Sequence, residues 1–358
     1  MVRHFAVLLA IASCFRSAHA AEDIVIETFD GVKLRGVYYQ ANATKMKNNA
    51  CVMMLHPYTK DGKAQGWVDL AKNLSEQQGY HVIAFDFRFH GGRTMDVIPD
   101  LFWNQPFNKS QITGATRKPP KSELSFKDIR NPRDYYPMLV NDVMAVRTYL
   151  DVLNDQGKVN TSTIYLVGAG DAASIAFLYM TAEWHREREV PNVAIPPSVV
   201  SAQRGLFAGG TSAGRDIAGA VFLSPSRHPS MSSTAIENLV SNERYGAVQL
   251  RTETPMLFLN GEKDPKGREG SKYFFDKVLV ANPKPNSRIQ KLPLTYHVEI
   301  KDQKLAEMDL LGKGFETEAK IFEFLTALDK DRKNKVAIPN RKYTKPLPVI
   351  FQSYGVGG

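Results

Sequence analysis

A serine in a glycine-rich pentapeptide is the first candidate for chemistry. Residues 210–214 read GTSAG, a G-x-S-x-G spacing whose small residues allow a sharp turn that exposes Ser212 as a nucleophile. Such a serine attacks a carbonyl only when a histidine takes its proton and an acid orients that histidine. Asp264 and His297 follow Ser212 in the chain and could take these roles. The pattern by itself therefore indicates acyl transfer through Ser212.

The residues around this serine contradict that interpretation. The sharp turn, or elbow, needs a buried strand directly before the nucleophile to aim it. It also needs a helix directly afterwards, whose amino end stabilises developing negative charge. Residues 201–210, SAQRGLFAGG, contain an arginine and three glycines and lack the alternation of a strand. Residues 217–225, IAGAVFLSP, are typical of a buried strand and not of a helix. We therefore interpret Ser212 as a decoy in a glycine-rich loop.

A better elbow lies upstream. An apolar strand leads into Gly168-Ala169-Gly170-Asp171-Ala172, and a helix rich in small residues follows. In the direct register Gly170 takes the position of the nucleophile, and glycine has no side chain that could attack. A register shifted by one residue places Asp171 there instead. Asp171 also has a structural interpretation, because an acidic residue at the start of a helix complements the helix dipole.

The periodicity of apolar residues predicts the elements that position these groups. Short apolar or alternating runs predict strands, and apolar residues at helical spacing predict helices. The expected strands are 23–29, 33–40, 50–56, 81–86, 162–168, 217–225, 255–261 and 287–293. The expected helices are 67–78, 141–154, 171–185, 270–280 and 316–330. This alternation indicates an α/β fold with a mostly parallel eight-stranded sheet and helices on both faces.

The elements belong to one expected domain, residues 21–330, because no linker interrupts them. Within it, residues 95–137 are polar, proline-containing and aperiodic, and we expect a lid-like insertion there. A basic tail follows at 331–358. Most of the net charge of +9 lies there, since residues 330–358 hold seven Lys or Arg and one Asp. We expect a solvated extension, or one in weak electrostatic contact with an anionic envelope surface.

Composition excludes several classes of protein. The apolar content of 43% and the charged content of 23% are typical of a globular chain with a sizeable core. No metal-ligand spacing such as H-E-x-x-H or C-x-x-C occurs, so we expect no metal and no cofactor. No nucleic-acid-binding motif occurs either.

The N-terminus is typical of an export signal. Met1–His4 is basic, Phe5–Ser13 is apolar, and Ala18–Ala20 forms an A-x-A cleavage site. We expect removal of residues 1–20 and a periplasmic or secreted protein. In an alternative interpretation Cys14 is lipidated and anchors the chain. After cleavage only Cys51 remains, which excludes an internal disulfide, and its apolar strand predicts burial.

The chain resembles the α/β-hydrolase family over residues 23–330. His56-Pro57, after the third expected strand, is similar to the oxyanion-hole loop of that family. Residues 85–94, FDFRFHGGRT, are similar to its D-x-R-G-H-G-x-S stretch, with Phe89 where glycine is usual.

Two further stretches carry the resemblance. Residues 255–264, PMLFLNGEKD, resemble the acid-bearing loop, and residues 292–297, LPLTYH, resemble the histidine-bearing loop. The resemblance implies the α/β-hydrolase fold, with Asp264 at the position of the acid and His297 at that of the general base.

Two functional hypotheses follow. In the first, the protein lacks a serine nucleophile, is non-catalytic or weakly catalytic, and binds a small ligand at four residues of the elbow region: His56, Pro57, Tyr58 and Gly170. In the second, it is an active hydrolase. The family resemblance extends that activity to esters, halides or epoxides, with Asp171 or Ser212 as the nucleophile beside His297 and Asp264.

Overall fold

The computed structural model of the chain describes residues 21–58, 60, 62–90, 94–186, 212–241, 249–279, 295–339 and 341. The proposed signal at 1–20, with Cys14, and the expected strand at 287–293 lie outside these residues. Within the described ranges, no helix has both the length and the apolar character needed to cross a bilayer.

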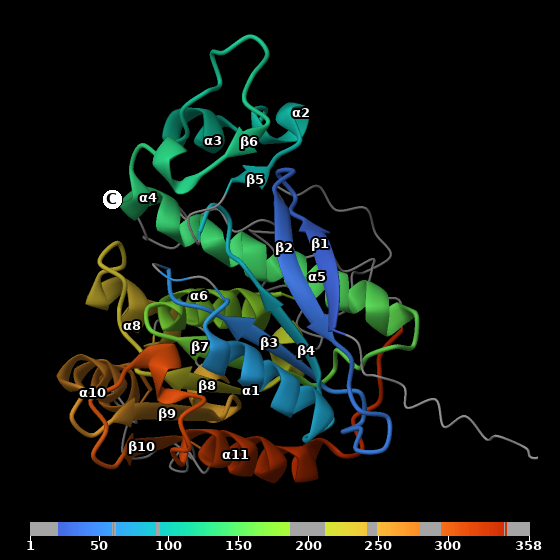
Figure 1. The fold of residues 1–358 in the computed structure, drawn as a ribbon, viewed down its shortest axis with the longest axis vertical. Coiled ribbons are helices and arrows are strands. Elements are labelled where there is room, and N and C mark those ends of the chain that lie inside the picture. The colour runs from blue at the N-terminus through green and yellow to red at the C-terminus, as the bar shows by residue number, and fades with distance from the viewer. Residues whose placement is uncertain are drawn as a thin grey trace, which may run out of the picture.

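An eight-stranded sheet forms the centre of the molecule (Figure 1), with strand order β1-β2-β4-β3-β7-β8-β9-β10. β2 pairs antiparallel with both β1 and β4, and the other pairs are parallel. The strands are β1 Ala21–Glu27, β2 Lys33–Tyr39, β3 Cys51–Leu55, β4 His81–Phe85, β7 Ile164–Ala169, β8 Ile217–Leu223, β9 Met256–Gly261 and β10 Tyr296–Ile300. The mostly parallel sheet expected from the sequence is confirmed.

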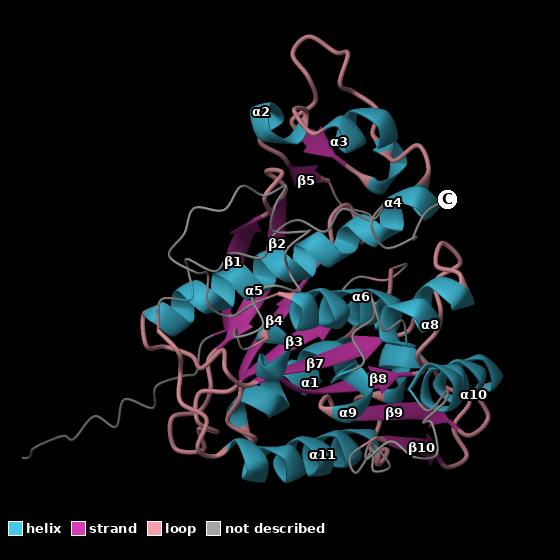
Figure 2. Cartoon of the chain, turned by 180° about the vertical axis from the view of Figure 1, so that it is seen from behind, coloured by secondary structure: helices cyan, strands magenta, loops and turns pink. Residues whose placement is uncertain are grey.

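Helices cover both faces of this sheet, as expected. α5 (Leu139–Asp155) and α6 (Ala172–His185) pack on one face, while α1 (Gln65–Glu76) and α11 (Thr317–Arg332) pack on the other (Figure 2). Every residue of β3, β7, β8 and β9 is buried, because side chains on both faces meet a helix. Shorter helices in the described part of the carboxyl-terminal half are α8 Ser233–Ser241, α9 Gln249–Thr252 and α10 Pro265–Lys272.

The expected insertion folds into a small lobe at the top of Figure 1. The two-residue strands β5 (Met95–Asp96) and β6 (Glu123–Leu124) pair antiparallel, and short helices surround them. These are α2 Pro99–Phe102, α3 Pro106–Gln111, η1 Phe126–Asp128, α4 Pro132–Tyr135 and η2 Tyr136–Met138. Proline begins α2, α3 and α4, where its missing N–H leaves no hydrogen bond unmade.

A buried arginine connects this lobe to the sheet. Arg88, after β4, donates two hydrogen bonds to Asp30 in the first hairpin, at 2.7 and 3.1 Å, and one to Asp142 of α5 at 2.7 Å. Asn108 of α3 donates to the same Asp30 carboxylate at 2.9 Å. All four side chains are buried, so the D-x-R sequence after β4 has a structural role.

The last described strand of the sheet differs from the strand expected from the sequence. The described strand is β10, and His297 lies inside that strand and not in a loop after it. The segment at 296–300 pairs in parallel with β9, which draws His297 into the sheet. The helix expected at 270–280 begins earlier, since Asp264 caps α10 at Pro265, and it continues as the π-helix η4 (Tyr273–Leu279).

The basic tail also differs from expectation at its only described residue beyond 339. Arg341 is 1% exposed and forms an ion pair with Asp216, so the chain returns to the domain there. Cys51 is buried, as expected, and its burial raises the pKa of its thiol to about 12.

Candidate functional site

Gly170 is the turning point between β7 and α6. It is the single residue with positive φ (+57°) in the turn from Ala169 to Ala172, and its N–H donates to the carbonyl of Leu223 at 2.9 Å. An elbow places its nucleophile in this strained conformation, at the carboxyl end of a buried strand. Gly170 therefore has the backbone conformation that an elbow requires at its tip. Asp171 has ordinary helical angles and starts α6.

A carboxylate occupies the space in front of Gly170. A Cβ atom on Gly170 would lie 2.5 Å from Oε1 of Glu307, too close for any side chain at position 170 unless Glu307 moves. Glu307 has a φ of +55° and begins η5 (Glu307–Leu310), in the loop that follows β10. Lys60 holds it through an ion pair of 3.0 Å and also approaches Asp309 at 3.5 Å.

No motif in the sequence points directly to Glu307. Its loop comes after the last strand, which is where the family resemblance expects the general base. An expected last strand at 287–293 puts His297 in that loop, which is why His297 is the expected base. Because the last described strand is Tyr296–Ile300, the loop in which the resemblance expects the general base begins at residue 301.

The Asp171 carboxylate is bound by a backbone N–H group of the loop after β3. Its Oδ1 accepts a hydrogen bond of 2.8 Å from the backbone N–H of Tyr58, in the loop after β3. In a serine hydrolase this loop and the residue after the nucleophile provide the two N–H groups that bind the oxyanion. Burial raises the pKa of Asp171 to about 6; hydrogen bonds from the N–H groups of Tyr58 and of Asp171 itself oppose that rise, and the nearby Glu307 adds to it.

His56 and Pro57 shape the loop that presents the Tyr58 N–H. His56 is fully buried, with Nδ1 2.8 Å from the carbonyl oxygen of Pro57 and Nε2 3.0 Å from the N–H of Phe87. The second contact makes Nε2 the acceptor, so Nδ1 carries the proton and donates to Pro57. His56 thus connects the loops after β3 and β4, and its ring is not available to a ligand.

An aromatic cluster lies against the elbow. We use this name for five side chains: Tyr58, His90, Phe126, Tyr136 and His228. Tyr58 contacts the other four, with ring centroids 4.2 to 5.7 Å apart, and Tyr136 stacks on His228 at 3.5 Å. The hydroxyl of Tyr136 donates to the backbone carbonyl of Asp171 at 2.6 Å. Phe126 belongs to the insertion, so the cluster connects the insertion to the elbow.

Both imidazoles of the aromatic cluster are neutral near pH 7. Burial lowers the pKa of His90 to about 3 and that of His228 to about 4. Ser174, one turn into α6, accepts a hydrogen bond of 3.2 Å from the N–H of His228 and so has a structural partner.

The structure does not bring His297 to the elbow. His297 pairs in register with Phe258 of β9, which is level with Phe222 of β8 and Gly168 of β7. Three strand spacings separate His297 from Gly168, or about 14 Å. The Nε2 atom of His297 instead lies 2.8 Å from Oδ1 of Asn260, and burial lowers the pKa of this imidazole.

Asp264 lies directly after β9, where the resemblance places the acid. Its Oδ1 accepts a hydrogen bond of 3.0 Å from the N–H of Gly267 and caps α10. Among the described residues, no hydrogen bond or ion pair joins Asp264 to His297. The two residues do not form the acid–base pair expected of an acyl-transfer site.

Ser212 lies at the opposite edge of the sheet from Gly170. It precedes the amino end of β8, whereas Gly170 follows the carboxyl end of the parallel strand β7. Its hydroxyl donates to the carbonyl of Trp184 at 2.7 Å and accepts from Gly214 at 3.1 Å, which caps η3 (Ala213–Asp216). A Cβ on Gly214 would collide with the Trp184 ring, so packing explains this glycine of the motif.

Within the described part of the chain, no group of three or more His, Cys, Asp or Glu side chains is arranged to hold a metal ion.

Neither a known family model nor a curated protein sequence matches the chain. Among solved structures, the Pyrococcus furiosus esterase Pf2001 is similar at a TM-score of 0.47 and 16% identity, over 86% of this chain and 90% of that one. The carboxylesterase EstE1, from a metagenomic library, gives 0.43 and 12% over 87% and 88%. The Pyrococcus horikoshii acylaminoacyl peptidase gives 0.46 and 10% over 86% and 41%.

Proposed function

We propose that this chain, which has the α/β-hydrolase fold, is a non-catalytic or weakly catalytic protein that binds a small ligand near its elbow. One observation carries the proposal. Gly170 stands where the fold presents a nucleophile, and the Glu307 carboxylate fills the space that a side chain there would need.

The chemistry of the elbow supports the absence of efficient acyl transfer. A covalent acyl intermediate needs a nucleophilic side chain, and glycine has none. The Tyr58 N–H already binds the Asp171 carboxylate, so a developing oxyanion would have to displace a resident anion. A carboxylate could still activate water, which supports weak hydrolysis at most.

The same groups indicate the ligand class. Phe126, which packs on the buried Tyr58, offers exposed apolar surface near the elbow, and Lys60 offers a half-exposed ammonium whose present partners are carboxylates. A small molecule with an apolar body and a carboxylate matches both features. The backbone of His56-Pro57-Tyr58 and Gly170 would line its site.

Two assays test the catalytic half of this proposal. Purified protein is treated with a fluorophosphonate probe and assayed with short acyl esters, and we expect neither labelling nor saturable turnover. Labelling of Ser212, or turnover that is lost in Ser212→Ala, would contradict the proposal. Turnover of a haloalkane or an epoxide that is lost in Asp171→Asn would support the alternative in which Asp171 is the nucleophile.

Thermal shift measurements test the binding half. We expect short-chain carboxylates to raise the Tm, because a ligand that binds only the folded state stabilises it. Lys60→Gln should reduce that shift, whereas the matched control Lys72→Gln, on the exposed side of α1, should not. Equal shifts in both variants would contradict a carboxylate site at Lys60.

Export is a separate part of the proposal. Its support is the basic start, apolar run and A-x-A site within residues 1–20. The mature N-terminus, read by mass spectrometry from cells that secrete the protein, should be Ala21. A lipidated Cys14 would show the anchored alternative instead. Contact of the basic tail with an anionic envelope surface should disappear at high salt.

A further inference from the structure

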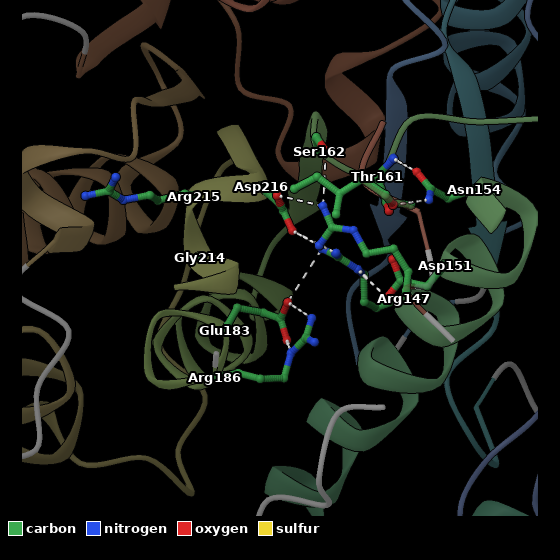
Figure 3. Close-up of polar contacts among 12 residues, drawn as sticks. Arg147, Asp151, Asn154, Thr161, Ser162, Glu183, Arg186, Gly214, Arg215 and Asp216 are labelled. Atoms are coloured by element: carbon green, nitrogen blue, oxygen red, sulfur yellow. Dashed lines mark hydrogen bonds and ion pairs between the residues drawn. The ribbon is translucent and has the colours of Figure 1, made fainter. Parts of the chain in front are cut away.

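Six charged side chains meet at the amino edge of the sheet, opposite the elbow, and all of them are buried except Arg186, which is partly buried. They are Arg147 and Asp151 of α5, Glu183 of α6, Arg186, Asp216 of η3, and Arg341. Figure 3 shows Arg147 pointing toward Asp216 and Glu183, with Arg186 on the far side of Glu183. Three guanidinium groups balance three carboxylates, so the set is neutral as a whole.

Arg341 enters this cluster from the carboxyl-terminal segment. Its Nη1 donates to Oδ2 of Asp216 at 2.7 Å, and its Nη2 donates to Oδ1 of Asp216 at 3.2 Å and to Oγ of Ser162 at 3.0 Å. This is the two-point pairing of a planar guanidinium with a carboxylate, which an ammonium group cannot reproduce. Arg341 is 1% exposed and Asp216 is fully buried.

Asparagine side chains hold the main chain leading to Arg341. Asn160 and Asn48 both donate to the carbonyl of Lys335, at 2.7 and 2.6 Å, and Asn154 donates to that of Ile338 at 2.8 Å. Asp155 then accepts the N–H of Arg341 itself at 2.8 Å. The domain therefore binds this segment as it would bind an extended peptide, through main-chain groups and one inserted side chain.

We propose that the charge cluster at the amino edge of the sheet contains a guanidinium-binding site, and that Arg341 is its resident ligand. Asp216 and Ser162 are the recognising groups. Without Arg341 the cluster retains three carboxylates and two guanidinium groups, and the excess negative charge is buried. A small guanidinium compound supplied in solution restores the charge balance of the cluster. The site recognises the guanidinium group itself, whether or not that group is covalently attached to the chain.

Chemical rescue tests this site in the full-length protein. Arg341→Ala should lower the Tm by roughly 5–10 °C, since loss of one partner from a buried ion pair is strongly destabilising. Millimolar methylguanidinium should recover part of that loss in Arg341→Ala and should not raise the Tm of the unmodified protein. Methylammonium has the same charge but lacks the planar pair of N–H donors, so it should not raise the Tm of Arg341→Ala.

Two variants complete the design. Lys335→Ala removes a positive charge from the same segment but keeps the backbone carbonyl, and its Tm should not change. Arg341→Ala with Asp216→Asn should not respond to methylguanidinium. The proposal is overturned by an unchanged Tm in Arg341→Ala, or by equal recovery with methylammonium.

Arg341→Lys keeps the test decisive if the alanine variant does not fold. Lysine preserves the charge and loses the two-point pairing, so its Tm should fall below that of the unmodified protein. A Tm equal to that of the unmodified protein would show that the site selects only charge, which contradicts a guanidinium site.

Discussion

Glu307 and Gly170 meet at the elbow, where the Glu307 carboxylate stands 2.5 Å from the point that a Cβ on Gly170 would occupy. Because Glu307 itself has a φ of +55°, both sides of this contact use a backbone conformation that L side chains rarely adopt. Strain of this kind persists only where the surrounding structure enforces it. The contact places the Glu307 carboxylate in the space that a side chain on residue 170 would need.

Replacement of the elbow glycine should destabilise the protein without creating an esterase. Gly170→Ser introduces a side chain at φ +57° and a clash with Glu307, and we expect a loss of about 2–4 kcal/mol in the free energy of unfolding. Urea denaturation measures this loss.

A matched control separates the clash from the backbone strain. Gly157 has a similar φ of +73° but nothing within 4 Å of its Cβ position, so Gly157→Ser should cost only about 1–2 kcal/mol. Adding Glu307→Ala to Gly170→Ser should recover the difference between the two glycine variants. No recovery would show that Glu307 does not fill the elbow.

Asp171 should make stability fall between about pH 4 and pH 6. Burial raises its pKa to about 6 in the folded protein, above the ordinary aspartate value of 3.8, so the folded state binds more protons than the unfolded state in this window. The free energy of unfolding therefore decreases as pH rises through the window, by about 2–3 kcal/mol, and is flat above it.

Asp171→Asn tests this pH dependence. Asparagine can still accept the hydrogen bond from Tyr58 but does not ionise, so the variant should gain stability relative to the unmodified protein between pH 4 and pH 7. The comparison uses chemical denaturation at several pH values. If the free energy of unfolding had the same pH dependence in both proteins, Asp171 would not be the group that causes the loss of stability.

Ser212 should behave as a helix cap. Ser212→Ala removes the acceptor of the Gly214 N–H and should cost about 1 kcal/mol, with no effect on binding at the elbow. Gly214→Ala should cost more, about 1–3 kcal/mol, because the added methyl group meets the Trp184 ring. Differential scanning calorimetry can rank the two variants. A larger effect of Ser212→Ala than of Gly214→Ala would contradict this account.

His297 should be dispensable at the elbow. His297→Gln can keep a hydrogen bond to Asn260, and at about 14 Å from Gly168 it should leave ligand-induced Tm shifts unchanged. A loss of those shifts in His297→Gln, comparable to the loss in Lys60→Gln, would place His297 in the binding site after all.

The sequence predicts most of the central sheet for a simple physical reason. β3, β7, β8 and β9 are buried on both faces, so each reads as an unbroken apolar run. The positive φ in the turn between β7 and α6 follows from local chemistry as well, because only glycine adopts such a φ without strain and Gly170 stands between a strand and a helix.

The remaining features depend on contacts that local patterns do not record. Residues 287–293 and 296–300 are both short and strand-like, and only pairing with β9 assigns the second to the sheet. Arg341 resembles any lysine or arginine of a solvated tail until Asp216, 125 positions earlier in the chain, is placed beside it. The position of Glu307 at the elbow likewise depends on its contacts with Gly170 and Lys60, which are distant from it in the sequence.

The position of Arg341 has a consequence for biosynthesis. Arg147, Glu183 and Asp216 are all made well before it, so a nascent chain contains an incomplete charge cluster until residue 341 has left the ribosome. The cluster can therefore be completed only after residue 341 has been synthesised. A chain that ended before residue 341 would lack this guanidinium, and its buried cluster would hold three carboxylates but only two guanidinium groups.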